Sequence, residues 1–251
     1  MRTKVRRCPG GLVLMTDRRV ARRPLVDVVA AAVGGGVRWV VLREKDLPRA
    51  ERLALAVELR AVLADVDGAL IVAGPDPLDG DAVHLPAAGP YPPPRLALVG
   101  RSCHDAAELA RLTTEDYATL SPVFPTRTKP GYGPALGPDG LRELVAASPV
   151  PVLALGGIET PDQVRACVDP GATGVAVLGA LMRAENPTDT ATTLGSAFQE
   201  ASTRLARTLH PPTDVPTRGL RPTVPTEGSS LTAQSGHGRP QPPTATTEER
   251  Q

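Results

Sequence analysis

The sequence predicts a closed barrel of eight parallel strands surrounded by helices, the (β/α)8 or TIM-barrel class, over residues 11–209. Eight short apolar runs recur in order along this region. Runs of this kind are typical of strands buried on both faces of a parallel sheet. Helical or loop segments separate nearly all of them, as in a chain of β-α units. A doubly wound open sheet is the alternative, but no G-x-G-x-x-G motif follows the first run.

The predicted strands are short and rich in aliphatic residues, and the run 68–73 is a clear example because it contains only apolar residues and glycine. Two connections, 74–81 and 86–94, are too rich in proline for regular helices, and we expect them to be irregular. The expected strands cover residues 11–16, 37–42, 68–73, 82–85, 96–99, 116–120, 150–155 and 173–178.

Proline and capping residues mark where the predicted helices begin. Pro24 opens the first helix, and the three glycines at 34–36 end it. Pro48 opens the second, and Thr160 is a suitable N-cap for the fifth. The expected helices cover residues 24–33, 48–65, 105–112, 139–147, 161–168 and 186–209.

Composition argues against several classes of function. The net charge of +1 predicts no concentrated basic surface for nucleic acid, and 2% aromatic residues predict no stacking platform for bases. Three cysteines lie far apart, which indicates reduced thiols rather than a metal site. No apolar run approaches the length of a membrane span. We therefore expect a cytoplasmic protein that binds neither nucleic acid nor membranes; the sequence does not specify its oligomeric state.

The two ends of the chain differ in composition from the region between them. Residues 1–10 are short and basic, and we expect a disordered leader. Residues 210–251 are dominated by proline, threonine, glycine and serine, with almost no large apolar side chain. Such a segment buries too little apolar surface to offset its ordering entropy, so we expect a disordered tail without catalytic residues.

The loop 121–133 is the densest group of potential anion-binding residues. The hydroxyls of Thr126 and Thr128 flank Arg127 and directly precede Lys129, and two glycines follow. Hydroxyl donors, fixed cations and a permissive backbone together form a good anion receptor. An ordinary polar loop is the alternative interpretation.

Active sites of such barrels lie at the carboxyl ends of the strands, so the polar residues there are candidates. Gly156, Gly157 and Gly179 follow the last two strands, where backbone N–H groups can hold a phosphate. The side chains at the strand ends are mainly cations and hydroxyl donors, which indicates a polyanionic ligand. They are Asp17, Arg43, Glu44, Lys45, Ser102, His104, Thr126, Thr128 and Lys129.

Each candidate also has an alternative interpretation. Arg43 and Lys45 can form a salt-bridged surface pair with Glu44. His84 follows a short strand and His104 abuts a helix start, and we expect structural rather than catalytic roles for both.

The order of these motifs resembles the thiamine phosphate synthase family, which also contains thiazole tautomerases. The resemblance extends from residue 12 to about residue 205. The Pro-Val-Phe-Pro-Thr-Arg-Thr-Lys run at 122–129 and the Arg-Glu-Lys run at 43–45 are its most specific parts. The segments that carry it are 14–17, 41–45, 82–85, 99–104, 116–117, 121–129, 155–158 and 174–177.

The resemblance implies a transferase of thiamine biosynthesis. Such an enzyme joins a pyrimidine methyl diphosphate to a thiazole phosphate, giving thiamine phosphate and pyrophosphate. Pyrophosphate leaves first, so cations must neutralise it. By the family pattern, the diphosphate is held by Arg43, Lys45, Ser102 and Lys129, of which Arg43, Lys45 and Lys129 are the expected catalytic residues. The thiazole phosphate is held by Thr126, Thr128, Gly157, Leu178 and Gly179.

The family pattern also implies Mg²⁺ held by two acidic positions, and this chain departs from it at both. Ala73-Gly74 stands after the third strand, and residues 86–89 contain no carboxylate. Asp76, Asp79 or Asp81 would have to supply the missing ligands.

Three functions therefore stand open. The first is a thiamine phosphate synthase, with Mg²⁺ as a possible cofactor. The second is a thiazole phosphate tautomerase that works without metal, although its family histidine is replaced by Pro122, and His104 would have to act as the base. The third is a non-catalytic binder of thiazole or thiamine phosphates. In all three the expected partners are small phosphorylated molecules.

Overall fold

A computed structural model describes residues 8–126 and 134–209. The predicted leader 1–10 lies outside the described residues except for 8–10, and the predicted tail 210–251 lies wholly outside them. Both therefore stay predictions. The region between them contains the whole predicted barrel apart from residues 127–133.

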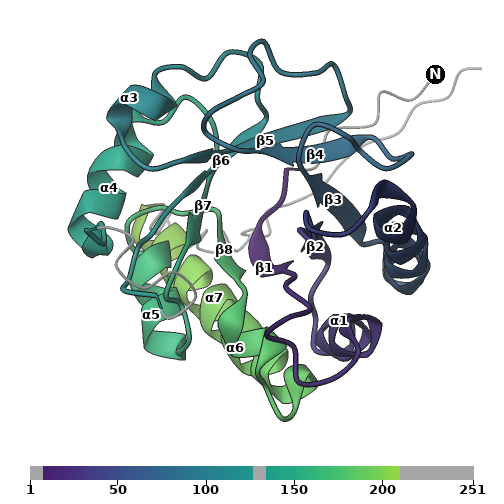
Figure 1. Ribbon diagram of the computed structural model, residues 1–251. Coiled ribbons are helices and arrows are strands. Elements are labelled where there is room, and N and C mark those ends of the chain that lie inside the picture. The colour runs from purple at the N-terminus through teal and green to yellow at the C-terminus, as the bar shows by residue number, and fades with distance from the viewer. Residues whose placement is uncertain (1–7, 127–133, 210–251) are drawn as a thin grey trace, which may run out of the picture. The chain divides into compact units, whose positions relative to one another are not determined.

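The eight strands form a closed parallel barrel in the order of the sequence, as predicted (Figure 1). Closure comes from β1 and β8, which pair in parallel with Gly11 opposite Gly174 and Leu14 opposite Val177. The strands are β1 (Gly11–Met15), β2 (Trp39–Leu42), β3 (Ala69–Ala73), β4 (Ala82–Leu85), β5 (Leu98–Cys103), β6 (Tyr117–Leu120), β7 (Val152–Leu155) and β8 (Gly174–Val177).

Helices cover most of the outer surface of the barrel (Figure 1). The C-terminal helix α7 packs against α1, α5 and β1, so it seals the side on which the barrel closes. The helices are α1 (Leu25–Gly34), α2 (Arg49–Ala64), α3 (Ala106–Leu109), α4 (Gly137–Ala147), α5 (Pro161–Val168), α6 (Gly179–Met182) and α7 (Pro187–Leu209).

Two apolar layers hold this arrangement together. One lies inside the barrel and includes Val13, Ile71 and Leu153, each at most 1% exposed. The other lies between the strands and the helices, with Leu14 and Leu59 fully buried. Consecutive strand residues point to opposite layers, which explains why the strands are apolar at neighbouring positions.

Loops and not helices connect β3 to β4 and β4 to β5, in agreement with the irregular connections expected at 74–81 and 86–94 (Figure 1). The fully buried Arg101 of β5 fixes the second loop by donating to the carbonyls of Pro86 at 2.9 Å and Pro90 at 2.8 Å. Its guanidinium also lies 3.9 Å from the centre of the Tyr91 ring.

The carboxylate of Glu115 accepts a hydrogen bond from the Arg101 Nε at 2.5 Å and balances this buried charge. Burial opposes ionisation of Glu115, but hydrogen bonds from the Thr113 N–H and from Arg101 outweigh it and hold the pKa of Glu115 below its usual range.

The structure differs from the prediction most clearly at three elements. The fifth strand was expected to end at residue 99 but continues to Cys103, because residues 100–103 pair with β6. Ser102 therefore lies within a strand and not in the loop behind it. Residues 179–182 form the short helix α6, which was not expected, and α3 is shorter than the predicted 105–112.

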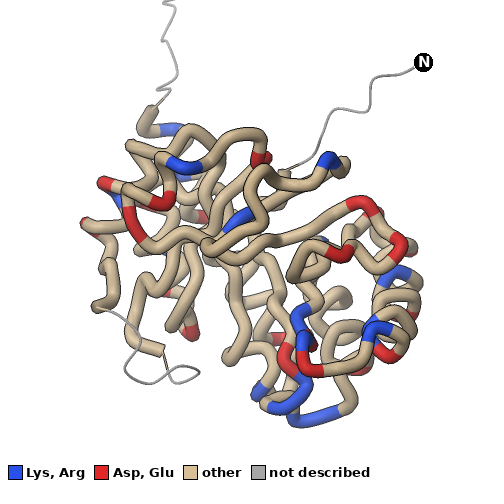
Figure 2. Tube along the Cα trace, turned by 45° about the horizontal axis from the view of Figure 1, so that its top comes forward, with Lys and Arg blue, Asp and Glu red and all other residues tan. Residues whose placement is uncertain are grey.

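Basic and acidic residues are interspersed along the described chain and do not gather on separate faces (Figure 2). Among the described residues, no helix is long and apolar enough to cross a membrane.

Candidate active site

A cavity of about 300 Å³ opens at the carboxyl ends of the strands. Residues from or just after every strand contribute to its wall, so the whole barrel positions it. Its described lining consists of Met15, Arg43, Lys45, Ala73, His84, Leu85, Pro86, Ala87, Ser102, His104, Ser121, Pro122, Thr126, Leu155, Gly156, Gly157, Ile158, Glu159, Ala176, Leu178 and Gly179.

Most of the residues predicted for the site line this cavity. The expected diphosphate-binding residues in the lining are Arg43, Lys45 and Ser102. The expected thiazole phosphate residues in the lining are Thr126, Gly157, Leu178 and Gly179. Thr128 and Lys129 belong to the segment 127–133, outside the described residues, so their roles stay predictions.

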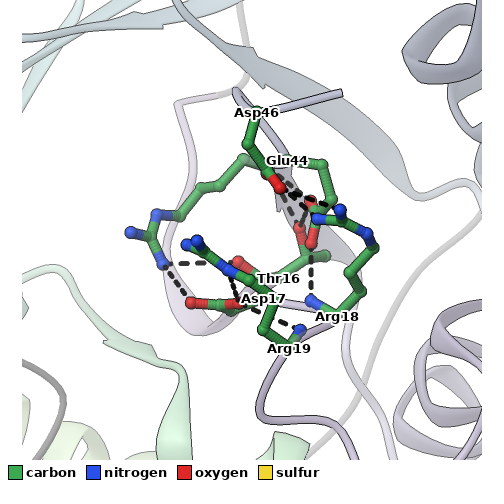
Figure 3. A network of polar contacts seen from close by, with 7 residues as sticks. Thr16, Asp17, Arg18, Arg19, Glu44 and Asp46 are labelled. Carbon is green, nitrogen blue, oxygen red and sulfur yellow. Dashed lines mark hydrogen bonds and ion pairs between the residues drawn. The ribbon is translucent and has the colours of Figure 1, made fainter. Parts of the chain in front are cut away.

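A polar network fixes the turn that carries Arg43 (Figure 3). Glu44, only 4% exposed, accepts hydrogen bonds from the Thr16 hydroxyl, from the Arg18 N–H at 2.8 Å and from the Arg43 N–H at 3.0 Å. Because Thr16 and Arg18 follow β1 while Arg43 follows β2, this one carboxylate joins the ends of two strands. The network extends outwards to the exposed pair of Arg18 and Asp46 at 2.8 Å.

The Arg43 side chain turns away from Glu44. Its Nη1 donates to the Thr16 carbonyl at 3.4 Å and lies 3.9 Å from an Asp17 carboxylate oxygen. The alternative of an Arg43–Glu44 surface pair is therefore wrong for Arg43, because Glu44 binds backbone and hydroxyl groups instead.

His84 of β4 is 4% exposed, lines the cavity and connects three strands. Its Nδ1 is 3.2 Å from the Tyr117 hydroxyl of β6, and its Nε2 is 3.0 Å from Ser102 Oγ of β5 and 3.3 Å from Thr119 Oγ1. Burial lowers the pKa of His84 to about 3, and the nearby cations Lys45, Arg101 and Arg43 lower it further. His84 is therefore neutral at neutral pH.

His104 also lines the cavity, at the end of β5. Its Nδ1 and its backbone N–H each lie 2.7 Å from a carboxylate oxygen of Glu108 in α3. This carboxylate orients the imidazole ring, an arrangement suited to a general base.

The glycines after β7 allow the loop 121–126 to pack over the strand end. Val123 and Phe124 donate backbone hydrogen bonds to the carbonyls of Leu155 at 2.9 Å and Gly156 at 3.0 Å. A Cβ atom on Gly157 would lie 2.5 Å from the Pro125 carbonyl oxygen, and its φ is +70°. Only glycine fits there, so this glycine shapes the cavity wall by close approach of two backbones.

The described residues do not fit a resident Mg²⁺, which requires oxygen ligands. At the end of β3 the Arg52 Nη2 donates to the Ala73 carbonyl at 2.9 Å, so a cation lies beside the position where a metal ligand was expected. The one carboxylate in the described lining is Glu159, which is paired with Arg183 at 2.8 Å.

The proposed substitutes do not supply a metal site either. Asp76 and Asp79 bind Arg49 at 2.8 and 3.0 Å, and neither they nor Asp81 belongs to the described lining. Among residues 8–126 and 134–209, no group of three or more histidine, cysteine, aspartate or glutamate side chains is arranged to hold a metal ion.

The sequence did not predict that the buried Tyr117 supports His84 of the cavity lining, and the structural role expected for His84 stays a prediction. Tyr117 lies in a predicted strand and in the segment 116–117 of the family resemblance, and its contact with His84 joins residues 33 positions apart. The alternation of β6 gives a signal: Tyr117 and Thr119 are spaced to point inwards together, beside Ser102 of the paired strand.

Comparisons with known proteins agree with one another. A family model described as thiamine monophosphate synthase matches residues 12–181. The chain is 34% identical over 207 residues to a thiamine-phosphate synthase of Leptospira biflexa, covering 75% of this chain and 97% of that protein. It is 38% identical over 192 residues to a thiamine-phosphate synthase of Albidiferax ferrireducens, covering 70% of this chain and 86% of that protein. A solved structure of a thiamine phosphate pyrophosphorylase from Pyrococcus furiosus has a TM-score of 0.66 at 28% identity, covering 76% of this chain and 96% of that one.

Proposed function

Because this chain belongs to the thiamine monophosphate synthase family, we propose that it is a transferase that condenses a pyrimidine methyl diphosphate with a thiazole phosphate. The products are thiamine phosphate and pyrophosphate. The observation that carries the proposal is the cavity lining. Arg43, Lys45 and Ser102 come from one run of neighbouring strands, β2 to β5, whereas Thr126, Gly157 and Gly179 follow the strands of the next run, β6 to β8. We call these two runs the two sides of the cavity.

The proposed chemistry follows from this division. The bond between the pyrimidine methyl carbon and the diphosphate oxygen breaks, and its electron pair leaves with pyrophosphate. The thiazole nitrogen then gives its lone pair to the cationic carbon and forms the new C–N bond. Arg43 and Lys45 stabilise the charge that develops on the leaving group, together with the predicted Lys129. Thr126 and the backbone of Gly157 and Gly179 hold the thiazole phosphate at the other side.

The metal requirement follows from the same residues. Since the described side chains lack a carboxylate set for Mg²⁺, the proposal assigns neutralisation of pyrophosphate to the side-chain cations. We therefore expect condensation to proceed in the presence of EDTA as well as with added Mg²⁺.

The test is a product assay with the purified full chain, both substrates, and either Mg²⁺ or EDTA. Thiamine phosphate in both reactions supports the whole proposal. Product with Mg²⁺ alone supports the condensation and contradicts its assignment to side-chain cations. Binding of thiazole phosphate without product would contradict the transferase and favour a non-catalytic binder.

A second candidate, a thiazole phosphate tautomerase, is favoured by the contact between His104 and Glu108 in the cavity wall. Tautomerisation moves a proton between two positions of the thiazole, and an oriented imidazole can carry it. The test follows the thiazole phosphate by NMR in D2O. Proton exchange that is lost in His104→Gln supports this activity, and unchanged exchange in that variant contradicts the assigned base.

A further inference from the structure

A column of three hydrogen-bonded side chains runs from the barrel interior to the cavity. Tyr117 is fully buried and absent from the described cavity lining, whereas His84 and Ser102 belong to that lining. The Tyr117 hydroxyl lies 3.2 Å from His84 Nδ1, and His84 Nε2 lies 3.0 Å from Ser102 Oγ. The column crosses β6, β4 and β5, so it is set by the barrel and not by a loop.

The fold makes room for Tyr117 and fixes the plane of its neighbour. A Cβ atom on Gly100 would lie 2.0 Å from a carbon of the Tyr117 ring, so glycine at this position of β5 is required by the ring. The ring stacks on His84 with centroids 5.5 Å apart and planes inclined by 25°. Neither ring can rotate freely in this packing.

The directions of the hydrogen bonds follow from the burial of the two rings. Burial raises the pKa of Tyr117, so its phenol keeps one O–H, and burial lowers the pKa of His84 to about 3, so its imidazole carries one N–H. A buried O–H needs an acceptor. Among the described residues, His84 Nδ1 is the group within hydrogen-bond distance of the Tyr117 hydroxyl, so the hydroxyl donates to Nδ1. The imidazole proton therefore lies on Nε2.

This tautomer determines what Ser102 presents to the cavity. With its proton on Nε2, His84 donates to Ser102 Oγ at 3.0 Å, the nearer of its two hydroxyl partners, since Thr119 Oγ1 lies at 3.3 Å. The serine hydroxyl hydrogen is then left to point elsewhere. In the opposite tautomer Nε2 would accept that hydrogen, and Ser102 would present lone pairs to an anion. A diphosphate binds the first arrangement and is repelled by the second.

We propose that Tyr117 is a positioning residue whose hydroxyl, 3.2 Å from His84 Nδ1, selects the Nε2–H tautomer and thereby makes Ser102 a hydrogen-bond donor to the diphosphate. This inference rests on the proposed function, because it takes diphosphate as the anion at Ser102. It adds a residue outside the cavity wall to the parts that control binding within it.

A double-mutant cycle with inorganic pyrophosphate as the probe tests the connection. Tyr117→Phe keeps the ring and removes the hydroxyl, and we expect pyrophosphate affinity to fall about tenfold with thiazole phosphate affinity unchanged. In a Ser102→Ala background the same change should have no further effect, because Tyr117 acts through Ser102. An equal loss in both backgrounds overturns the proposal.

A matched control is Tyr91→Phe, which removes a hydroxyl that donates to the Ala87 carbonyl at 3.0 Å and does not contact His84. It should leave pyrophosphate affinity unchanged. A tenfold loss in this control would mean that any lost tyrosine hydroxyl has the same effect, and it would overturn the specific role of Tyr117.

Imidazole ¹⁵N spectra test the tautomer itself, and the chain has only four histidines to assign. In the wild-type protein we expect His84 to carry its proton on Nε2. A proton on Nδ1 overturns the proposal even if Tyr117→Phe fails to fold. Failure of the wild-type protein to bind pyrophosphate would instead contradict the proposed function and the donor role of Ser102, while the spectra would still report whether Tyr117 selects the tautomer.

Discussion

The two sides of the cavity wall are built in different ways. The side formed by β1, β2, β4 and β5 uses polar side chains supported by buried groups. Glu44 and Thr16 accept hydrogen bonds from the Arg43 backbone N–H, and His84 is hydrogen-bonded to the Ser102 hydroxyl. The side formed by β6, β7 and β8 relies on backbone, with the loop 121–126 packed on the Gly156–Gly157 turn.

The two sides should therefore respond differently to substitution. Charge and hydrogen-bond direction govern the first side, so a change of one polar atom should alter binding of one ligand while the fold survives. Clearance between two backbones governs the second side, so an added methyl group should disturb the fold as well as the ligand. Four substitutions or conditions separate these behaviours.

The largest effect is expected from Gly157→Ala. The new Cβ would meet the Pro125 carbonyl at 2.5 Å at a residue whose φ is +70°, which should lower the free energy of unfolding by about 3 kcal/mol or more. Urea unfolding measures this loss. Gly195→Ala in α7 is the control, because nothing lies within 4 Å of its Cβ position, and it should raise stability by about 0.5–1 kcal/mol. Equal unfolding midpoints for the two variants would contradict the packing argument.

Arg43→Ala should act on binding and not on the fold. Loss of a charge-assisted contact is expected to weaken pyrophosphate binding by about 10–100-fold, with thiazole phosphate binding unchanged. Titration calorimetry with each ligand measures both. Arg204→Ala removes an exposed arginine paired with Asp169 in the outer helical layer and should change neither affinity. If Arg43→Ala weakened the binding of pyrophosphate and of thiazole phosphate equally, the two sides of the cavity would not be distinct.

Acid should destabilise the side that contains His84. Its folded pKa of about 3 lies below the ordinary value of 6.5, so the folded state binds fewer protons in that interval. Stability should therefore fall as the pH drops from 6.5 towards 3, by about 2 kcal/mol at pH 5. Carboxylates with lowered pKa values, such as Asp76 and Glu115, add to the loss only at lower pH.

Unfolding free energies measured at pH 7 and pH 5 check this dependence of stability on pH. We expect the difference in unfolding free energy between pH 7 and pH 5 to disappear in His84→Asn and to persist in His104→Gln. An unchanged slope in His84→Asn would mean that another group titrates in this interval.

The smallest effect is expected from removing charge in the network around Arg43. Glu44→Gln places an amide among three hydrogen-bond donors and should cost about 1–2 kcal/mol of stability, with weaker pyrophosphate binding because the Arg43 turn loosens. Asp46→Asn removes the same charge at the exposed end of the network and should change stability less. Equal effects on stability would indicate that burial of Glu44 does not matter.

Local patterns were sufficient to predict the barrel and much of the cavity lining. The glycine and proline positions marked the strand ends and helix starts, and the ends of parallel strands necessarily meet on one side of a barrel. Arg43, Lys45, Ser102, Thr126 and the glycines were found in this way.

Long-range contacts account for what the sequence did not predict. Glu44 looked like a surface ion-pair partner because two of its three hydrogen-bond donors follow a different strand, 26 and 28 residues away. The extent of β5 depended on pairing with β6, since Gly-Arg-Ser has little strand propensity of its own. The role of Gly157 depended on the Pro125 carbonyl, which only the folded loop brings near.

The most direct test of the two-sided cavity is a crystal structure of the full chain with thiamine phosphate and pyrophosphate bound together. We predict pyrophosphate within hydrogen-bond distance of Arg43, Lys45 and Ser102, with the phosphate of thiamine phosphate against Gly157 and Gly179. Pyrophosphate on the glycine side, or both ligands outside the cavity, would contradict the account.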